Sequence, residues 1–428
     1  MRRTMERPLT KNIVPGREPL SLGEYEKAGG CQGLRKALRM TPAEIQGEVT
    51  KANLLGRGGA GFSAGRKWSH MPMGADARRP KYLVVNADEM EPATMKDRLL
   101  MEGDPHQLIE AVIIGSYVIE ASVAYIFVRR EYHLSARRLE KAVAEAYAAG
   151  YLGKSVLGSG FGLELRIHRS AGRYMCGEAA GMLNAIEGKR AIPRSRPPHM
   201  AQVGLWGKPT LVNNVETLVN VPHIVLRGWE WFRGLSRSAE EGGTKIYGAS
   251  GRVKHPGLWE LPMGTTAREI IEEHAGGIAD GRTLRGFLPG GASSGFLTEK
   301  HLDVKMDFAS VRAAGSHFGT GTLVVLDDRT CPVGACTSLE LFFARESCGW
   351  CTPCREGLPW VARTLQALEE GRGAPGDLDV LDDHVRQILP DHTFCDLATG
   401  AMLPLAGALK YFREDFERHV REKRCPYE

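Results

Sequence analysis

The chain has 428 residues, a formal net charge of +5, 43% hydrophobic residues and 51 glycines. This composition excludes a disordered chain because it supplies ample apolar side chains for a core, and at roughly 150 residues per domain the length predicts two to four domains. No block of five or more Lys or Arg residues occurs, which argues against nucleic-acid binding.

The first half of the chain alternates between predicted strands and predicted helices. An irregular start over 1–72, with one or two helices including 42–55, is followed by short apolar runs and amphipathic runs. Strands and helices in this alternating order predict a parallel sheet with right-handed crossovers. The expected strands are 82–86, 123–128 and 163–167, and the expected helices are 105–121, 134–149 and 177–186.

The pattern changes in the second half. Short strands surround a capping-box pair, Thr266 and Glu269, which predicts a helix ending near His274. Together they predict a small α+β module, whereas the helical periodicity after Cys331 predicts a bundle of four helices. The expected strands are 244–249, 258–261, 284–288 and 322–326, and the expected helices are 336–346, 355–370, 377–389 and 402–422.

The strongest chemical signal is the run Cys348-Gly-Trp-Cys351-Thr-Pro-Cys354, with Cys395 further along the chain. Three thiolates from one short loop and a fourth from elsewhere suit a cubane iron–sulfur cluster. Zinc is the alternative, although structural zinc usually takes two separated pairs of ligands. The other cysteines considered are interpreted as buried thiols: Cys331 and Cys336, which compete for the fourth position, and Cys31 and Cys425.

The second signal is the glycine-rich run Gly56-Arg57-Gly58-Gly59-Ala60-Gly61-Phe62. It matches G-x-G-x-x-G, but a dinucleotide fingerprint needs a strand before it and a helix directly after it. Here a predicted helix precedes the run, and the segment 63–69 carries a further glycine. The loop is therefore expected to approach a planar or phosphorylated ligand, with Lys67 supplying charge. A structural glycine turn is the alternative.

Two further polar segments are candidates for ligand contacts. The run 86–91, Asn-Ala-Asp-Glu-Met-Glu, lies at the carboxyl end of a predicted strand, where ligands of parallel sheets bind. Its three acids suit hydroxyls and amides, and a solvated acidic loop is the alternative. Segments 174–178 and 212–217 follow, the second with paired Asn side chains that can read a ring edge or a phosphate. A structural Asn turn is the alternative for that pair.

Together these segments resemble the family of flavin-binding F subunits of NADH:quinone oxidoreductase, respiratory complex I. The resemblance covers nearly all of the chain, and residues 404–416 also fit the bacterial form. It is carried by GRGGAGF at 56–62, KWS at 67–69, NADE at 86–89, KDR at 96–98, YMCGE at 174–178, GLWGKPTLVNNVETL at 204–218 and ESCGWCTPCR at 346–355.

The resemblance implies an α/β and α+β multidomain fold with a flavodoxin- or Rossmann-like parallel sheet, a β-grasp (ubiquitin-like) module and a C-terminal four-helix bundle carrying an iron–sulfur cluster. The implied domains are an N-terminal segment with the glycine loop (1–72), an FMN- and NADH-binding domain (73–238), the β-grasp domain (239–330) and the bundle with a [4Fe–4S] cluster (331–428).

The resemblance also implies site residues. Glu89 and Glu91 would lie beside the flavin and nicotinamide as positioning groups, and Phe62 would stack in the adenine pocket. The implied cluster ligands are Cys348, Cys351, Cys354 and Cys395. The remaining implied cofactor contacts are Gly56, Arg57, Gly58, Gly59, Ala60, Gly61, Gly65, Lys67, Asn86, Asp88, Tyr174, Gly177, Glu178, Val212, Asn213, Asn214 and Thr217.

The implied function is oxidation of NADH by hydride transfer to FMN, with single electrons passing through one [4Fe–4S] cluster to partner subunits. The implied partners are a [2Fe–2S] thioredoxin-like subunit of the E type and a multi-cluster subunit of the G type, through which alone quinone is reached. We expect a cytoplasmic protein, peripheral on the inner face of the bacterial cell membrane, without a membrane-spanning segment or a secretory signal. The alternatives are a diaphorase subunit of a soluble hydrogenase or formate dehydrogenase, and a catalytically disabled metal-bound scaffold.

Four positions depart from the family's pattern. Ala93 stands where the family usually carries a glycine after the acid-rich loop. Ala179 stands where the family usually carries an acid that faces the NADH ribose, and a carboxylate there would repel a 2′-phosphate. His70 and His199 replace residues that are usually apolar or aromatic. We therefore expect relaxed discrimination between NADH and NADPH.

Overall fold

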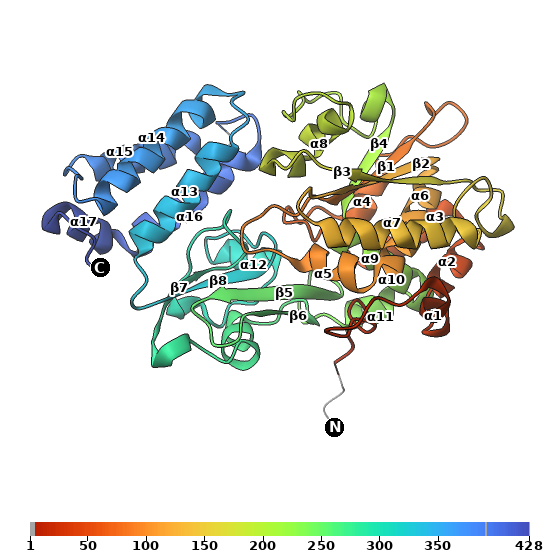
Figure 1. The fold of residues 1–428 in the computed structure, drawn as a ribbon, viewed down its shortest axis with the longest axis horizontal. Helices are drawn as coiled ribbons and strands as arrows, with labels where there is room; N and C mark the ends of the chain where they lie inside the picture. Colours follow the sequence, from red (N-terminus) through yellow and green to blue (C-terminus); the bar gives the residue numbers. More distant parts are fainter. Residues whose placement is uncertain (1–4, 390–391, 428) are drawn as a thin grey trace. The chain divides into compact units, whose positions relative to one another are not determined.

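A computed structural model describes residues 5–389 and 392–427 (Figure 1). The chain forms two compact units. The boundaries expected at 72/73, 238/239 and 330/331 remain predictions. The first unit comprises the chain up to Met90, Met95–Ile246 and Glu260–Gly264; the second comprises Glu91–Thr94, Tyr247–Trp259 and the chain from Thr265.

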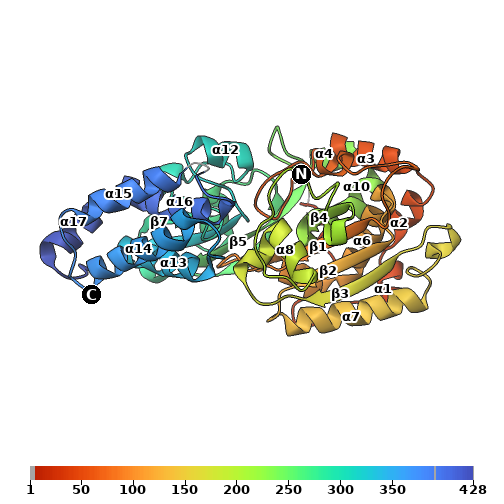
Figure 2. The ribbon, with the colours of Figure 1, turned by 90° about the horizontal axis from the view of Figure 1, so that it is seen from above.

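The first unit is built on a parallel sheet of four strands in the order β3-β2-β1-β4 (Figure 2). The three strands expected from the sequence are confirmed. The fourth was not expected, because its sequence, TLVNN, is short and ends in polar residues. The strands are β1 (Tyr82–Ala87), β2 (Val123–Val128), β3 (Glu164–Arg169) and β4 (Thr210–Asn214).

Helices cover both faces of this sheet. On one face, Leu83 of β1 meets helix α6 (Pro105–Ile119), whose Gly115 leaves space for the leucine side chain. On the other face, Val84 and Phe127 pack in a core cluster with Met182 of helix α8 (Ala179–Ile186). Helix α7 (His133–Ala148) runs along the edge strand β3 (Figure 2). Successive side chains of β1 point to opposite faces, so this strand contributes to the apolar core on each side of the sheet.

The beginning of the chain is more helical than expected. Instead of one or two helices, the described part of 1–72 contains four, three of them only six residues long, too short for periodicity to reveal. The remaining helices of this unit are also short. The helices are α1 (Leu22–Lys27), α2 (Gln32–Ala37), α3 (Pro42–Lys51), α4 (Ala64–Ser69), α5 (Lys96–Gly103), α9 (Val215–Val219), α10 (Val221–Arg227) and α11 (Trp229–Gly234).

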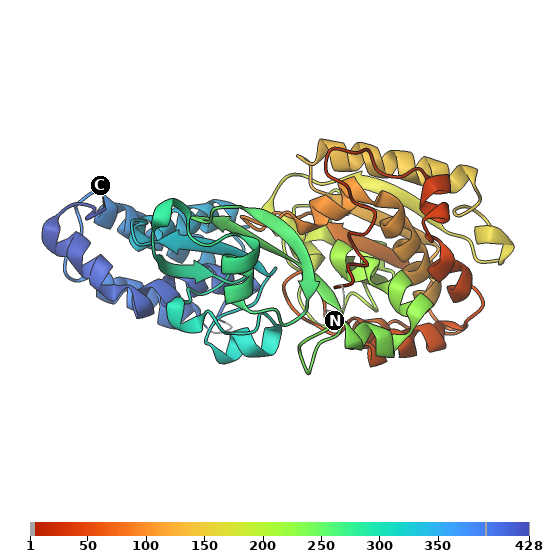
Figure 3. The same cartoon turned by 90° about the horizontal axis from the view of Figure 1, so that it is seen from below.

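The second unit contains most of a mixed sheet in the order β6-β5-β8-β7, drawn in green to cyan in Figure 3. Strands β5 and β8 pair in parallel, and β7 pairs antiparallel with β8. The expected capping box between Thr266 and Glu269 is confirmed, and it opens a turn that continues as a π-helix, Glu269–His274. The strands are β5 (Thr244–Gly251), β6 (Gly257–Pro262), β7 (Leu284–Leu288) and β8 (Thr322–Asp327), and α12 is Phe308–Ala313.

The last part of the second unit is a helical bundle in which α13, α14, α15 and α16 pack in a ring, each against the next. The expected single helix over 402–422 is wrong: α16 begins at Asp396, and the chain breaks at Phe412, whose ring is buried against Phe296 at 5.6 Å between centroids. The helices are α13 (Pro332–Glu346), α14 (Thr352–Glu369), α15 (Asp377–Ile388), α16 (Asp396–Tyr411) and α17 (Arg413–Glu422). The expected fold class, with α/β and α+β parts and a bundle, is confirmed.

Among the helices in the described residues, none combines the length and the apolar character needed to cross a membrane.

Candidate functional site

The glycine-rich loop 56–62 joins α3 to α4 and lies against the carboxyl end of β4. Gly59 and Gly61 have φ of +120° and +66°, a region that favours glycine. A Cβ added to Gly58 would lie 3.1 Å from the Cβ of Asn214, so the bare backbone is what allows the close approach. A helix precedes the loop, as expected, but α4 follows it directly with Ser63 as N-cap. The loop therefore differs from a dinucleotide-binding turn only in the element before it, which is a helix instead of a strand.

The side chains around the loop have divided roles. The guanidinium of Arg57 is fully buried and donates to the carbonyl of Gly242 at 2.6 Å, while the backbone N–H of Arg57 donates to Thr217 Oγ1 at 2.8 Å. The Lys67 ammonium donates to the carbonyl of Val212, and burial lowers its pKa to about 8. Arg57 and Thr217 thus fix the loop, whereas Lys67 holds a cation beside the end of β4.

Two other members of the predicted set also have clear positions. Gly65 lies inside α4 where an added Cβ would stand 2.2 Å from Thr50 Oγ1, so its absence of side chain lets α3 and α4 pack. Phe62 is 48% exposed, with the Arg66 guanidinium 5.9 Å from its ring centroid. Gly65 thus shapes the scaffold, and Phe62 presents an aromatic ring to solvent.

The acids after β1 are buried, which argues against a solvated acidic loop. Asp88 is 4% exposed; its Oδ1 accepts from Ser170 Oγ at 2.9 Å, its Oδ2 is buried without a hydrogen-bond partner among the described residues, and burial raises its pKa to about 7. Glu89 accepts the N–H groups of Asp97 and Arg98 at 2.9 and 3.0 Å, and burial, reinforced by Asp97, raises its pKa to about 7. Both acids are therefore poised near neutral pH.

Glu91 belongs to the second unit. Its carboxylate accepts the backbone N–H and the hydroxyl of Ser293 at 2.6 and 2.7 Å. An added Cβ on Gly291 would lie 2.8 Å from the Glu91 side chain. A glycine-containing turn in the second unit therefore holds this carboxylate.

The segment 174–178 forms a 3-10 turn that leads into α8. The Asn86 amide donates to the carbonyl of Gly177 at 2.9 Å, which fixes the turn at the end of β1. Glu178 is the N-cap of α8: it accepts the N–H of Gly181 at 2.6 Å and pairs with Arg196 at 3.1 Å. Ala179 follows as the first residue of α8 and packs against the core cluster of the sheet. His70 and His199 are both exposed.

The paired asparagines do not form a turn. Asn213 lies in β4 and accepts from the indole N–H of Trp68 at 2.9 Å. Asn214 ends β4 and caps α9, where it accepts the N–H of Thr217 at 3.4 Å. Asn86 and Asn214 are register partners in β1 and β4, so both lie at the edge of the sheet formed by the carboxyl ends of its strands.

Sequence reasoning missed a group of buried charges behind this edge. The Lys96 ammonium lies 2.7 Å from Asp97 and 3.1 Å from Glu216, and the Lys245 ammonium lies 2.9 Å from Glu216, with all four side chains at most 4% exposed. Burial lowers the pKa of Lys245 to about 8. Burial raises the pKa of Glu216, but the neighbouring cations, Lys245 and Lys96 first and then Arg57, together with the N–H of Ile246, outweigh it and hold this pKa below its usual value. In the sequence, only the run Lys96-Asp97-Arg98 and Glu216 could have indicated these buried charges.

The cysteine loop lies in the second unit. Cys348 and Cys351 precede α14, and Cys354 is buried in its first turn with Sγ 3.1 Å from Ser347 Oγ. Cys395 is the N-cap of α16. The Trp350 ring lies 6.0 Å from that of Phe394, which brings the two cysteine-bearing loops together.

Known proteins match the chain along most of its length. Family models match at residues 49–223 (Nuo51 FMN-binding domain), 248–297 (SLBB domain) and 335–419 (NADH-ubiquinone oxidoreductase-F iron-sulfur binding region). The F subunit of NADH-quinone oxidoreductase from Salmonella typhimurium is 52% identical over 416 residues, 97% of this chain and 93% of the relative. The chain belongs to the family of NADH-quinone oxidoreductase F subunits. The F subunit numbered 2 of Rhizobium meliloti is 51% identical over 95% of this chain and 96% of the relative.

Family membership confirms the cofactors expected from the sequence, FMN and a [4Fe–4S] cluster, and an oxidoreductase subunit of the NADH dehydrogenase type. Among solved structures, the NAD⁺-reducing [NiFe]-hydrogenase in its air-oxidized state matches with a TM-score of 0.78 and 32% identity. That match covers 89% of this chain, which spans only 63% of the hydrogenase chain.

Proposed function

We propose that this chain takes electrons from NADH in an assembly of the NADH-quinone oxidoreductase type, with FMN in the first unit and one [4Fe–4S] cluster in the second. The observation that carries the proposal is the junction of β1 and β4. From β1 the chain proceeds to β2 and β3 on one side, and β4 joins on the other, so the strand order reverses there. Open α/β sheets bind ligands at the carboxyl ends of strands at such a point.

The residues at this junction fit FMN. The loop at Gly58 offers bare backbone for close approach to a planar group, and Lys67 supplies a cation for a phosphate. The buried Oδ2 of Asp88 needs a donor, which a ribityl hydroxyl supplies. Asn213 and Asn214 add amide groups at the same edge. We assign the flavin contacts to this set and to the other residues that the family resemblance implies.

The cysteine loop fits an iron–sulfur cluster. Cys348, Cys351 and Cys354 offer three thiolates from one loop, and Cys395 offers a fourth from the start of α16, a donor set of the kind [4Fe–4S] clusters require. When bound, FMN supplies hydride acceptance and the cluster supplies a one-electron acceptor. The chain's own residues position these groups and exclude water, and no side chain has to act as acid or base.

Relaxed dinucleotide selection is part of the proposal. Ala179 at the start of α8 leaves no carboxylate beside Glu178, and Glu178 is already paired with Arg196. A 2′-phosphate would therefore meet one fewer negative charge. We infer that the chain accepts NADPH as well as NADH.

The assembly follows from the relatives. F-subunit relatives at about 50% identity favour a place in complex I over that of the hydrogenase-type diaphorase, whose match is 32% identical. We propose the E-type [2Fe–2S] and G-type multi-cluster subunits as direct partners. Quinone would be reached only through partners, and the chain would lie peripherally on the inner face of the bacterial membrane.

The deciding experiment is an anaerobic titration of the chain, co-expressed with its smaller partner, with NADH and then NADPH while visible absorbance is followed. Bleaching of the flavin bands by NADH supports the proposal, and flavin that neither dinucleotide reduces contradicts it. An NADPH rate below about one-hundredth of the NADH rate, a gap of about 2.7 kcal/mol, contradicts relaxed selection. Ala179→Glu should lower the NADPH rate alone, whereas Ala179→Gln, of the same size but neutral, should not.

A further inference from the structure

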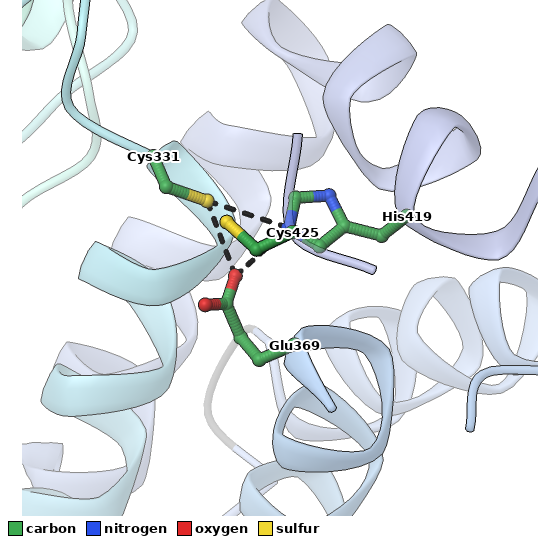
Figure 4. Close-up of side chains that lie close together, drawn as sticks. All are labelled: Cys331, Glu369, His419 and Cys425. Carbon is green, nitrogen blue, oxygen red and sulfur yellow. Dashed lines mark hydrogen bonds and ion pairs between the residues drawn. The ribbon is translucent and has the colours of Figure 1, made fainter. Parts of the chain in front are cut away.

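Four potential metal ligands from separate segments converge in the helical bundle (Figure 4). Cys331 is the N-cap of α13, Glu369 ends α14, His419 lies in α17 and Cys425 follows that helix. One ligand atom from each lies within 4.8 Å of the others. Cys331 and Cys425, interpreted from the sequence as separate buried thiols, therefore share one cluster.

The separations fit a tetrahedral metal centre. Cys331 Sγ lies 3.1 Å from Glu369 Oε1 and 3.5 Å from His419 Nε2, and those oxygen and nitrogen atoms are 2.9 Å apart. Zinc bonds of about 2.3 Å to sulfur and 2.0–2.2 Å to nitrogen and oxygen place tetrahedral ligands about 3.4–3.8 Å apart. Small outward movements therefore convert the hydrogen-bonded cluster into a coordination shell.

Contacts around the cluster already orient the ligands. The Nδ1 of His419 is hydrogen-bonded to the carbonyl of Asp415 at 2.6 Å, which turns Nε2 toward the sulfurs, as in many metal-binding histidines. The N–H of Gly334 donates to Cys331 Sγ at 3.3 Å, which fixes the position of this sulfur at the start of α13. His419 is fully buried and Cys425 is 4% exposed. Two of the four ligands are therefore shielded from solvent, and Cys331 and Glu369 are partly buried.

We propose that Cys331, Glu369, His419 and Cys425 bind one structural Zn²⁺ ion, separate from the iron–sulfur cluster. Two thiolates, an imidazole and a carboxylate are zinc ligands, and four protein ligands leave no open position for catalysis. The separation from the cluster loop is clear, because Cys351 and Glu369 lie at opposite ends of the 18-residue helix α14, about 27 Å apart. The ion would tie the start of α13 and the end of α14 to the C-terminal segment.

The test is metal analysis of the full chain, co-expressed with its partner and purified with its flavin and iron. We expect about one zinc per chain and an X-ray absorption spectrum with two sulfur and two nitrogen or oxygen neighbours. Zinc misplaced at the cysteine loop would instead show four sulfurs, and that result would overturn the proposal. Absence of zinc above background would overturn it as well.

Variants separate ligation from general stability. Cys425→Ser and His419→Gln should lose the zinc while flavin and iron stay bound. Cys336→Ala, which removes a buried thiol from the same helix as Cys331, should keep it. Equal zinc loss in Cys336→Ala counts against the site.

If the variants do not fold, the unaltered chain still allows a test of the zinc site. Cys331 and Cys425 should resist alkylation until a chelator removes the zinc, and mass spectrometry reads this directly. A disulfide between the two cysteines in the purified chain would show a thiol pair instead of a zinc site.

Discussion

The Glu89 carboxylate accepts the backbone N–H of Asp97 at 2.9 Å, so an acid at the end of β1 closes the N-terminus of α5. The neighbouring N–H of Arg98 donates to the other oxygen at 3.0 Å. These two N–H groups have no acceptor within their own helix. A negative charge there also interacts favourably with the positive end of the helix dipole. A residue expected beside the flavin is therefore first of all a cap that fixes α5 against the sheet.

Removing this cap should loosen α5. Glu89→Ala is expected to lower the stability of the first unit by about 1–2 kcal/mol, and the amides of Asp97 and Arg98 should exchange hydrogen faster. Glu89→Gln, which keeps an acceptor, should lose less. The control is Glu131→Gln, an exposed acid paired with Arg129. Unchanged exchange at Asp97 in Glu89→Ala would show that the carboxylate does not hold the helix.

The buried acid Asp88 predicts a pH dependence. Its pKa in the folded chain is about 7, above that of an unfolded aspartate near 4, because burial penalises the charge. A raised acid pKa gives stability that is present below the unfolded pKa and is lost as pH rises through the folded pKa. The flavin-free chain should therefore lose stability between about pH 4 and pH 7, by up to about 1.4 kcal/mol per pH unit from this group.

Thermal unfolding of the flavin-free chain at a series of pH values checks this. Asp88→Asn should be less sensitive to pH than the unaltered chain over the same window. Identical pH profiles for the two proteins would mean that the pKa of Asp88 is not raised in the folded chain.

The buried charges behind the sheet edge predict a severe variant. Glu216 is fully buried between the ammonium groups of Lys96 and Lys245, so Glu216→Gln leaves them with one carboxylate fewer. Breaking such a pair typically costs about 3–5 kcal/mol. Glu164→Gln removes an acid paired with Arg166 at the surface and should cost less than about 1 kcal/mol. Denaturant unfolding compares the two, and similar small losses would refute the importance of the buried network.

Much of the fold could be predicted because local signals were strong. Strands β1 and β2 are bounded, largely apolar runs, and their observed ends lie within one residue of those expected. Strand β4 was missed because three of its five residues are polar and its apolar partners are supplied by β1. The break at Phe412 was missed because it depends on packing against Phe296, more than 100 residues away.

For the sites, too, residues that are close in sequence could be predicted to act together, and residues that are far apart could not. Cys348, Cys351 and Cys354 are close in sequence, so their spacing alone indicated a common ligand. Cys331 and Cys425 are far apart, and only the folding of the bundle brings them together. Lys96, Asp97 and Glu216 lie inside motifs that were recognised, yet charge type alone did not reveal that they are buried together.

The bundle contains a buried acid whose replacement should stabilise it. Glu340 in α13 is fully buried, both of its carboxylate oxygens lack a hydrogen-bond partner among the described residues, and burial raises its pKa well above the usual value. An unsatisfied buried polar group costs about 1–3 kcal/mol, so Glu340→Met should raise the stability of the bundle. Because the acid must stay protonated in the fold, the gain should grow as pH rises above the unfolded pKa near 4.5. Hydrogen exchange in α13 at pH 6 and pH 8 measures this gain, with Glu417→Gln as an exposed control; a loss of protection, or a gain independent of pH, would contradict it.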